Sequence, residues 1–503
     1  DGLIHVSEDG GQNWRKSVLP KVPLRSFIND VEASSHDTNT VFAIADAHKM
    51  GDYSTYLFMS SDRGRTYKSI AGDLPSNTIV WVLKQDHIDS NLLFIGTEYG
   101  IYFSPNKGVN WIKLDAGVPT IAFRDLELHQ RDTDLVGATF GRGFYVLDDY
   151  SALRTISSAI KEKNNTLFTV RDAWWYVPNA PMQAKGMPSQ GSANFTAENP
   201  PFGAVFTYYL NEIPETSKAV RTNAEKALNK KQVSIPFPGW ERLQEELNEE
   251  EPQVLLLVSD EEGNPIRWIK GSAKKGLHRS NWDLKRSPPN PINLTQPAFK
   301  PPWAGDAEGP LVAPGNYNVV LYVVHNGILK AQGAPQKFTV KPVPTTTPDA
   351  NFEAIAEFQE NTSELSRQVS SAGRKLGEAA NRLKYMKAAI LETPKATPQV
   401  FASLGELEQK LSELQMRLYG DPIRQRLNEN SAPSIQSRLG EAMFGHWGTR
   451  QNPTETHKRN IEIAQSDFNR FKGDLSSYFK TLETYEATLE ALGAPYTPGR
   501  KFD

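Results

Sequence analysis

The sequence predicts a multidomain chain that is mainly β at first and α-helical at its end. A turn motif repeats within residues 1–150, short strand-like segments separated by turn residues follow, and leucine-rich heptads occupy residues 349–503. The periodicity therefore changes from that of strands to that of helices along the chain. A length of 503 residues suits about three domains.

The repeated motif has the form S-x-[DN]-x-G-x-[NT]-[WY] and begins at Ser7, Ser60 and Ser104. Acidic turns that lead into strands begin in step with it, at Asp37, Asp89 and Asp132, and the two sets of spacings agree to one residue. A unit of about 43–53 residues predicts β-propeller blades of four short antiparallel strands. Residues 1–150 would hold about three blades, fewer than a closed ring needs, so we expect further blades upstream or on another chain.

We expect the motif residues to build hairpins rather than to catalyse. Short polar side chains bond turn backbone, glycine takes a positive φ, and the aromatic residue plugs the blade. The residues concerned are Ser7, Asp9, Gly11, Trp14, Ser60, Asp62, Gly64, Tyr67, Ser104, Asn106, Gly108 and Trp111.

Composition excludes several classes of function. The net charge of −3 and the lack of a basic run argue against nucleic-acid binding. The absence of cysteine excludes disulfides, zinc-thiolate sites and cysteine nucleophiles. We find no apolar run long enough to span a membrane, no phosphate-binding loop and no histidine motif for a metal, so we expect neither cofactor nor metal.

Residues 151–345 predict a linker region followed by a β-sandwich. Residues 151–250 combine strands with a long loop rich in Pro, Gly, Ser and Asn, and with a polar stretch that holds at least one helix or excursion. Short strands with turn residues across 251–345 predict an immunoglobulin-like sandwich. Trp282 is either a sugar-stacking platform or a core residue, and we expect a core residue. Trp174 and Trp175 are adjacent and would point to opposite faces of a strand, so we expect one of them to be buried.

Residues 349–503 predict an antiparallel three-helix bundle with an interrupted middle arm. Apolar residues alternate at steps of three and four along three stretches, as in coiled coils. The joins contain proline and glycine, which allow reversals. These seams can satisfy one another within the chain or mediate self-association.

Two aspartates are weak candidates for a glycosidase acid–base pair. Asp30 and Asp125 occupy equivalent repeat positions at the start of the innermost strand. Glu98, Arg124 and Arg142 would face the same channel and are candidates for ligand binding.

Several segments resemble a family of large exported bacterial proteins with BNR (Asp-box) repeats, described as sortilin-like or as glycosyl hydrolases. The resemblance rests on residues 90–100, 124–129, 140–149, 200–204, 309–317 and 493–500. It implies an exported protein that is periplasmic, at the cell surface or extracellular, with a large propeller before Asp1. The family pattern often has histidine where Arg124 and Phe140 stand, so no catalytic residue is carried over.

These expectations converge on a non-catalytic portion of an exported propeller protein that recognises peptide, protein or glycan. Two alternatives stay open. One is a glycoside hydrolase acting on an extracellular polysaccharide, and the other is a structural subunit of a cell-envelope assembly.

Overall fold

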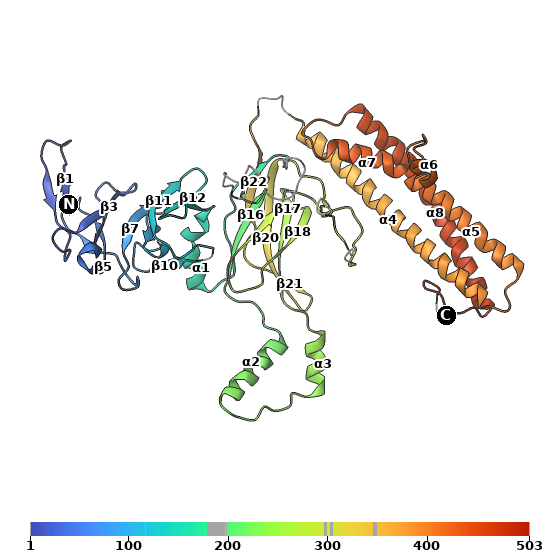
Figure 1. Ribbon diagram of the computed structural model, residues 1–503, viewed down its shortest axis with the longest axis horizontal. Helices are drawn as coiled ribbons and strands as arrows, with labels where there is room; N and C mark the ends of the chain where they lie inside the picture. The colour runs from blue at the N-terminus through green and yellow to red at the C-terminus, as the bar shows by residue number, and fades with distance from the viewer. Residues whose placement is uncertain are drawn as a thin grey trace.

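A computed structural model describes residues 2–115, 117–178, 197, 199–295, 299–301, 305–345 and 350–501. The fold is mixed β and α, and all but one of the strand pairings within these residues are antiparallel. Figure 1 shows the order in space: small sheets at the N-terminal end, a larger two-sheet region in the middle and long helices at the C-terminal end.

The first 150 residues form a series of small antiparallel sheets, in which consecutive strands are neighbours. The first two strands pair with each other, the next two groups form four-stranded sheets, and the last three strands form a three-stranded sheet. The strands are β1 (Ile4–Val6), β2 (Arg15–Ser17), β3 (Phe27–Ala33), β4 (Val41–Ala47), β5 (Asp52–Ser60), β6 (Lys68–Ser69), β7 (Val80–Gln85), β8 (Leu93–Thr97), β9 (Gly100–Ser104), β10 (Ile112–Leu114), β11 (Phe123–His129), β12 (Asp134–Thr139) and β13 (Phe144–Leu147), with the 3-10 turn η1 (His48–Met50) between β4 and β5.

Neighbouring sheets share apolar cores. Phe42 and Ile44 of β4 pack in one cluster with Val80 and Leu83 of β7. Alternate residues of a strand point to opposite faces, so nearly continuous apolar strands such as β4 and β8 are buried on both sides.

The last small sheets are tied to the 3-10 helix η2 (Tyr150–Arg154), which precedes α1 (Ile156–Glu162). Arg154 Nε and Nη2 donate to the two carboxylate oxygens of Asp86 at 2.8 and 2.9 Å, and the hydroxyl of Tyr150 donates to the same group at 2.7 Å. Asp86 is fully buried, so these bonds compensate a charge that would be costly alone.

Two further sheets enclose one core. One consists of β14 (Thr166–Leu167), β16 (Ala204–Leu210) and β19 (Gly276–Trp282); the other consists of β15 (Ala173–Trp175), β22 (Gln336–Pro342), β20 (Gly315–His325), β17 (Gln253–Asp260) and β18 (Pro265–Gly271), with β21 (Ile328–Ala331) beside β20. Trp282 is 1% exposed inside this core, as expected. Trp175 is buried, whereas Trp174 on the same strand is exposed. The predicted long loop lies mainly outside the described residues.

A helical arm is inserted between β16 and β17. It consists of α2 (Ser217–Lys230) and α3 (Trp240–Asn248), and Figure 1 shows it projecting from the two-sheet region.

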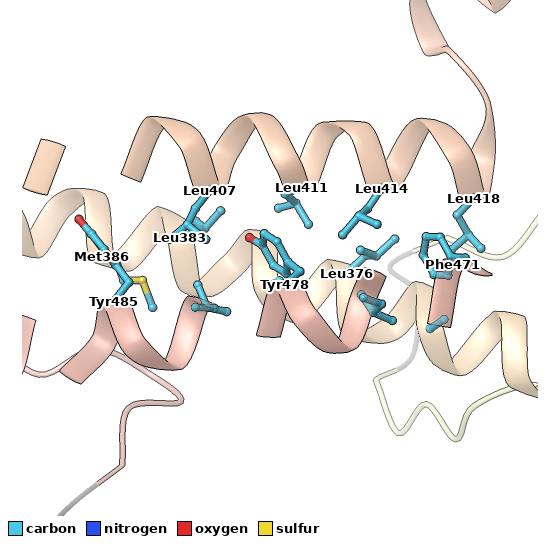
Figure 2. Packing of buried hydrophobic residues seen from close by; sticks show 14 of the residues in the cluster. Leu376, Leu383, Met386, Leu407, Leu411, Leu414, Leu418, Phe471, Tyr478 and Tyr485 are labelled. Atoms are coloured by element: carbon cyan, nitrogen blue, oxygen red, sulfur yellow. The ribbon is translucent and has the colours of Figure 1, made fainter. Parts of the chain in front are cut away.

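The C-terminal helices share a separate core. They are α4 (Phe352–Leu391), α5 (Pro398–Tyr419), α6 (Pro422–Arg426), α7 (Ile435–His446) and α8 (Glu455–Ala491). Figure 2 shows leucines of α4 and α5 facing Phe471, Tyr478 and Tyr485 of α8. The predicted heptad positions are buried except the last, Leu492, which is partly buried. Arg382 and Glu486 form a buried ion pair between α4 and α8, with 2.9 Å between Nε and Oε1. None of the described helices is long and apolar enough to cross a membrane.

Candidate functional site

Three β-bulges lie at equivalent positions of β3, β7 and β11. The register with the neighbouring strand shifts at Asn29, Trp81 and Arg124, one residue in each strand. A bulge leaves its extra residue without a cross-strand partner and re-aims its side chain. The repeat therefore presents three side chains of different chemistry at the same end of successive sheets.

Trp81 is the centre of a cluster that joins two of these sheets. The Arg124 guanidinium lies 3.5 Å from the centroid of the Trp81 ring, which is a close cation–π contact. Trp81 Nε1 donates to Glu98 Oε2 at 2.9 Å, and Arg124 Nη2 lies 3.7 Å from the same oxygen. The Arg124 and Glu98 side chains are 41% and 32% exposed, so a ligand can reach both.

Aromatic and acidic groups extend this cluster on both sides. The His48 ring meets Trp81 edge-on, with 5.8 Å between centroids, and His48 Nδ1 contacts the buried Asp46 carboxylate. On the other side, Phe140 lies 5.4 Å from the Arg124 guanidinium and is 71% exposed. We call Asp46, His48, Trp81, Glu98, Arg124 and Phe140 the bulge cluster.

The bulge cluster is suited to binding through flat and charged groups together. A guanidinium held against aromatic rings keeps its planar donors ordered, which favours carboxylate, hydroxyl or carbonyl acceptors. The exposed Phe140 ring adds an apolar surface on which a sugar face or a side chain can rest. Glu98 and Asp46 give the cluster one carboxylate more than the single guanidinium of Arg124.

The predicted binding residues divide between those inside the cluster and one outside. Glu98 and Arg124 lie together in it. Arg142 is exposed in the turn after Phe140, where its backbone N–H donates to Thr139 Oγ1 at 3.1 Å. The sequence analysis missed Trp81, although aligning Asn29–Asp30 with Arg124–Asp125 points to the equivalent position in β7.

The two candidate acids bond to backbone groups. Leu83 N–H donates to Asp30 Oδ2 at 3.0 Å, which ties β3 to the next sheet. Leu126 N–H donates to Asp125 Oδ1 at 2.9 Å, within the same strand. Among the described contacts, these two carboxylates share neither a hydrogen bond nor a common partner.

The three serine-led turns share one bonding pattern. The backbone N–H of Gly11, Gly64 or Gly108 donates to the serine hydroxyl at 2.7–2.8 Å, and that hydroxyl donates to the Asp or Asn two residues on. Backbone and side-chain bonds from Asn13, then from Ser7, lower the pKa of Asp9 to about 2. These carboxylates and amides are engaged in holding their own turns.

The aromatic residues that end the three turns differ in their surroundings. Trp111 is buried, and its Nε1 donates to Ile70 O of the preceding sheet at 3.0 Å. The Tyr67 hydroxyl accepts from Ser17 of the preceding pair of strands at 3.2 Å. Trp14 is 63% exposed and donates only within its own turn, to Gly11 O.

A cleft lies apart from the bulge cluster, where the three-stranded sheet meets the two-sheet region. It has a volume of about 860 Å³, and its walls include Trp174, Tyr176 and Phe202. His129, Asp132 and Asp134 lie beside it, with possible ligand atoms within 4.8 Å of one another. Both carboxylates already pair with arginines, Asp132 with Arg131 at 2.6 Å and Asp134 with Arg171 at 3.1 Å, so the group is largely neutralised.

Comparison with known proteins assigns the chain to no family. No family model matches the chain, and no curated protein matches it. One solved structure that is similar is an ancestral GH74 enzyme, at 12% sequence identity and a TM-score of 0.20. The alignment covers 61% of this chain and 31% of that enzyme, so the chain spans about a third of its length. Similarity at this level carries no argument for fold or activity.

Proposed function

We propose that residues 1–150 are consecutive blades of a BNR-type β-propeller, and that the bulge cluster binds a peptide, protein or glycan without catalysing its conversion. The repeated sheet order and the shared bonding of the three turns support the blade interpretation. In this proposal the three turns are Asp-boxes. Further blades, on this or another chain, would cover Trp14 as the preceding strands cover Tyr67 and Trp111.

The observation that carries the binding proposal is the Arg124 guanidinium stacked on Trp81 and held by Glu98. Three elements from two sheets converge there, and partly exposed charged groups beside an exposed aromatic ring favour recognition. Asp30 and Asp125 instead satisfy backbone N–H groups, which supports a structural role for them.

We further propose that the two-sheet region is an immunoglobulin-like sandwich, that the helical bundle braces it, and that the protein is exported. The contact between Trp175 and Phe352, with ring centroids 4.9 Å apart, supports bracing because it joins β15 to the start of α4. Cell fractionation of the source organism, with detection of the native chain, tests the export proposal.

Screening the full chain against an array of neutral and acidic oligosaccharides and a peptide library tests the proposed function. We expect ligands that are retained by the wild type and lost by Arg124→Ala. Arg459→Ala, which removes an exposed arginine on α8, is the matched control and should bind normally.

The same array material distinguishes binding from hydrolysis. We expect bound oligosaccharide to be recovered intact. Release of shorter products by the wild type, lost in Asp30→Asn or Asp125→Asn, would favour the glycoside hydrolase instead. Retention of the wild type by none of the probes, together with its recovery from cells in a stable large complex, would favour a structural subunit.

A further inference from the structure

The helical arm exposes an unusual amount of apolar surface. The segment from α2 through residues 231–239 to α3 leaves the two-sheet region (Figure 1) and has six large apolar side chains that are nearly half exposed or more. They are Val220, Val233, Ile235, Phe237, Trp240 and Leu247. Trp240 is 75% and Leu247 is 83% exposed.

Val220, Trp240 and Leu247 lie on the two helices, and the other three lie on the connection between them, where the Phe237 ring packs edge-on against Trp240 with 5.1 Å between centroids. Trp240, Leu243 and Leu247 recur at helical spacing on α3, yet the buried residue of that helix is Glu246. The described residues of α2 include none that is buried. Helices of 14 and 9 residues are marginal in water without packing, so we expect another surface to cover this arm.

The arm carries opposite charge on its two halves. Residues 217–231 contain five basic residues and one acidic residue, whereas residues 240–251 contain six acidic residues and one basic residue. The internal contact uses Arg221, whose guanidinium donates to Glu246 at 2.7 Å and to Glu225 at 2.7 Å.

Four lysines and four glutamates of the arm take no part in the contact of Arg221 with Glu225 and Glu246. Within the described residues, none of them forms an ion pair with a side chain of this chain. They are Lys218, Lys226, Lys230 and Lys231 on the α2 half, and Glu241, Glu245, Glu250 and Glu251 on the α3 half.

We propose that the arm pairs with the arm of a second copy of this chain, α2 of each copy lying against α3 of the other. A two-fold axis would bring each basic half onto an acidic half twice, which makes the surface self-complementary. A groove of about 670 Å³ lies beside these helices, lined by Val220, Pro238 and Trp240 and by charged residues that include Glu215, Glu241 and Glu245. It would receive apolar and lysine side chains of the other arm. The acidic half disfavours an anionic lipid surface as the occupant.

Sedimentation velocity of the full chain over a range of protein concentrations tests this proposal. We expect a concentration-dependent dimer. Two variants reverse the charge of one half each. The first carries Lys226→Glu, Lys230→Glu and Lys231→Glu, and the second carries Glu241→Lys, Glu245→Lys and Glu250→Lys. We expect each variant to self-associate about tenfold or more weakly than the wild type.

Mixing the two charge-reversed variants is the decisive experiment, because the reversed half of each variant then faces a half of opposite charge on the other. We expect a heterodimer of near wild-type affinity, which misfolded variants would not give. Lys395→Glu, Lys410→Glu and Lys480→Glu, on the C-terminal part, are the matched charge control and should leave the dimer intact.

Three outcomes would overturn the proposal. The first is a wild type that is monomeric at every concentration. The second is a dimer that persists in both reversed variants, which would place the interface elsewhere. The third is a mixture that does not recover the dimer, because the α2-to-α3 pairing would then be wrong and a different protein would cover the arm.

Discussion

Arg124 and Trp81 show how one bulge residue per sheet can bring side chains of two sheets together. Neither residue is paired with a residue of the neighbouring strand in the backbone ladder, and the two side chains contact each other and Glu98. Arginine suits this place because its guanidinium is planar and can stack while it still donates hydrogen bonds.

Arg124→Lys keeps the charge and removes the planar stack. For any ligand retained by the wild type, we expect Arg124→Lys to weaken binding by roughly tenfold, since the planar guanidinium that stacks on Trp81 is lost. Isothermal titration measures this, with Arg459→Lys as the control. An unchanged affinity would show that the charge alone matters at this position.

Asp86 makes stability depend on pH. Burial alone would raise its pKa, but hydrogen bonds from Arg154, from the backbone of Asp89 and from Tyr150 lower the pKa to about 2. A carboxyl with a lowered pKa stabilises the fold above its ordinary pKa of 3.8, and this contribution is lost as the pH falls toward 2.

Asp86→Asn should therefore remove about 2 kcal/mol at neutral pH and flatten the fall in stability between pH 4 and pH 2. Calorimetry of the wild type and the variant across that range measures both effects. Equal pH dependence in the two proteins would show that Asp86 does not carry this linkage.

At the scale of the element, a glycine in a turn allows close contact with the neighbouring sheet. Gly108 has φ +82°, and a Cβ there would lie 2.6 Å from Ile70 O of the preceding sheet. Gly10 has a similar φ of +72°, but a Cβ there would meet nothing within 4 Å. The two positions share backbone strain and differ in packing.

This difference predicts unequal costs for the same substitution. We expect Gly10→Ala to cost about 1 kcal/mol, which is the strain of a left-handed residue. We expect Gly108→Ala to cost about 3 kcal/mol or more, because the sheets must also move apart. Chemical denaturation followed by circular dichroism compares them, and equal costs would argue against close contact at Ile70.

At the scale of the whole molecule, an aromatic contact joins the two-sheet region to the bundle. Phe352 at the start of α4 packs against Trp175, and the Arg450 guanidinium lies 5.6 Å from the Phe352 ring centroid. Arg286 on the sheet side also contacts Glu360 of α4. The junction is small, so single residues in it should matter.

Phe352→Ala should loosen this junction without unfolding either part. We expect a larger radius of gyration in small-angle X-ray scattering and unchanged circular dichroism. Phe444→Ala, at an exposed phenylalanine of α7, is the control and should scatter like the wild type. An unchanged radius in Phe352→Ala would show that other contacts hold the two parts together.

The change from strands to helices and the apolar seams of the bundle could be predicted from the sequence, because both follow from local periodicity. Leu376 and Leu383 are buried as their heptad positions predict. The bulge cluster was reached only in part, since a bulge depends on pairing between strands that no single strand encodes. For the arm, the sequence predicts a polar stretch with at least one helix or excursion, and the structure has two helices there. Their exposed apolar faces are harder to predict, because the apolar residues alternate with many charges.

The binding proposal is tested most directly by measuring the affinity of the wild type, Arg124→Ala and Arg459→Ala for the best ligand from the array. We predict that Arg124→Ala loses about tenfold or more in affinity. We also predict that Arg459→Ala matches the wild type and that the ligand is recovered intact. Equal affinity of all three proteins, or cleavage of the ligand by the wild type, would contradict non-catalytic recognition at the bulge cluster.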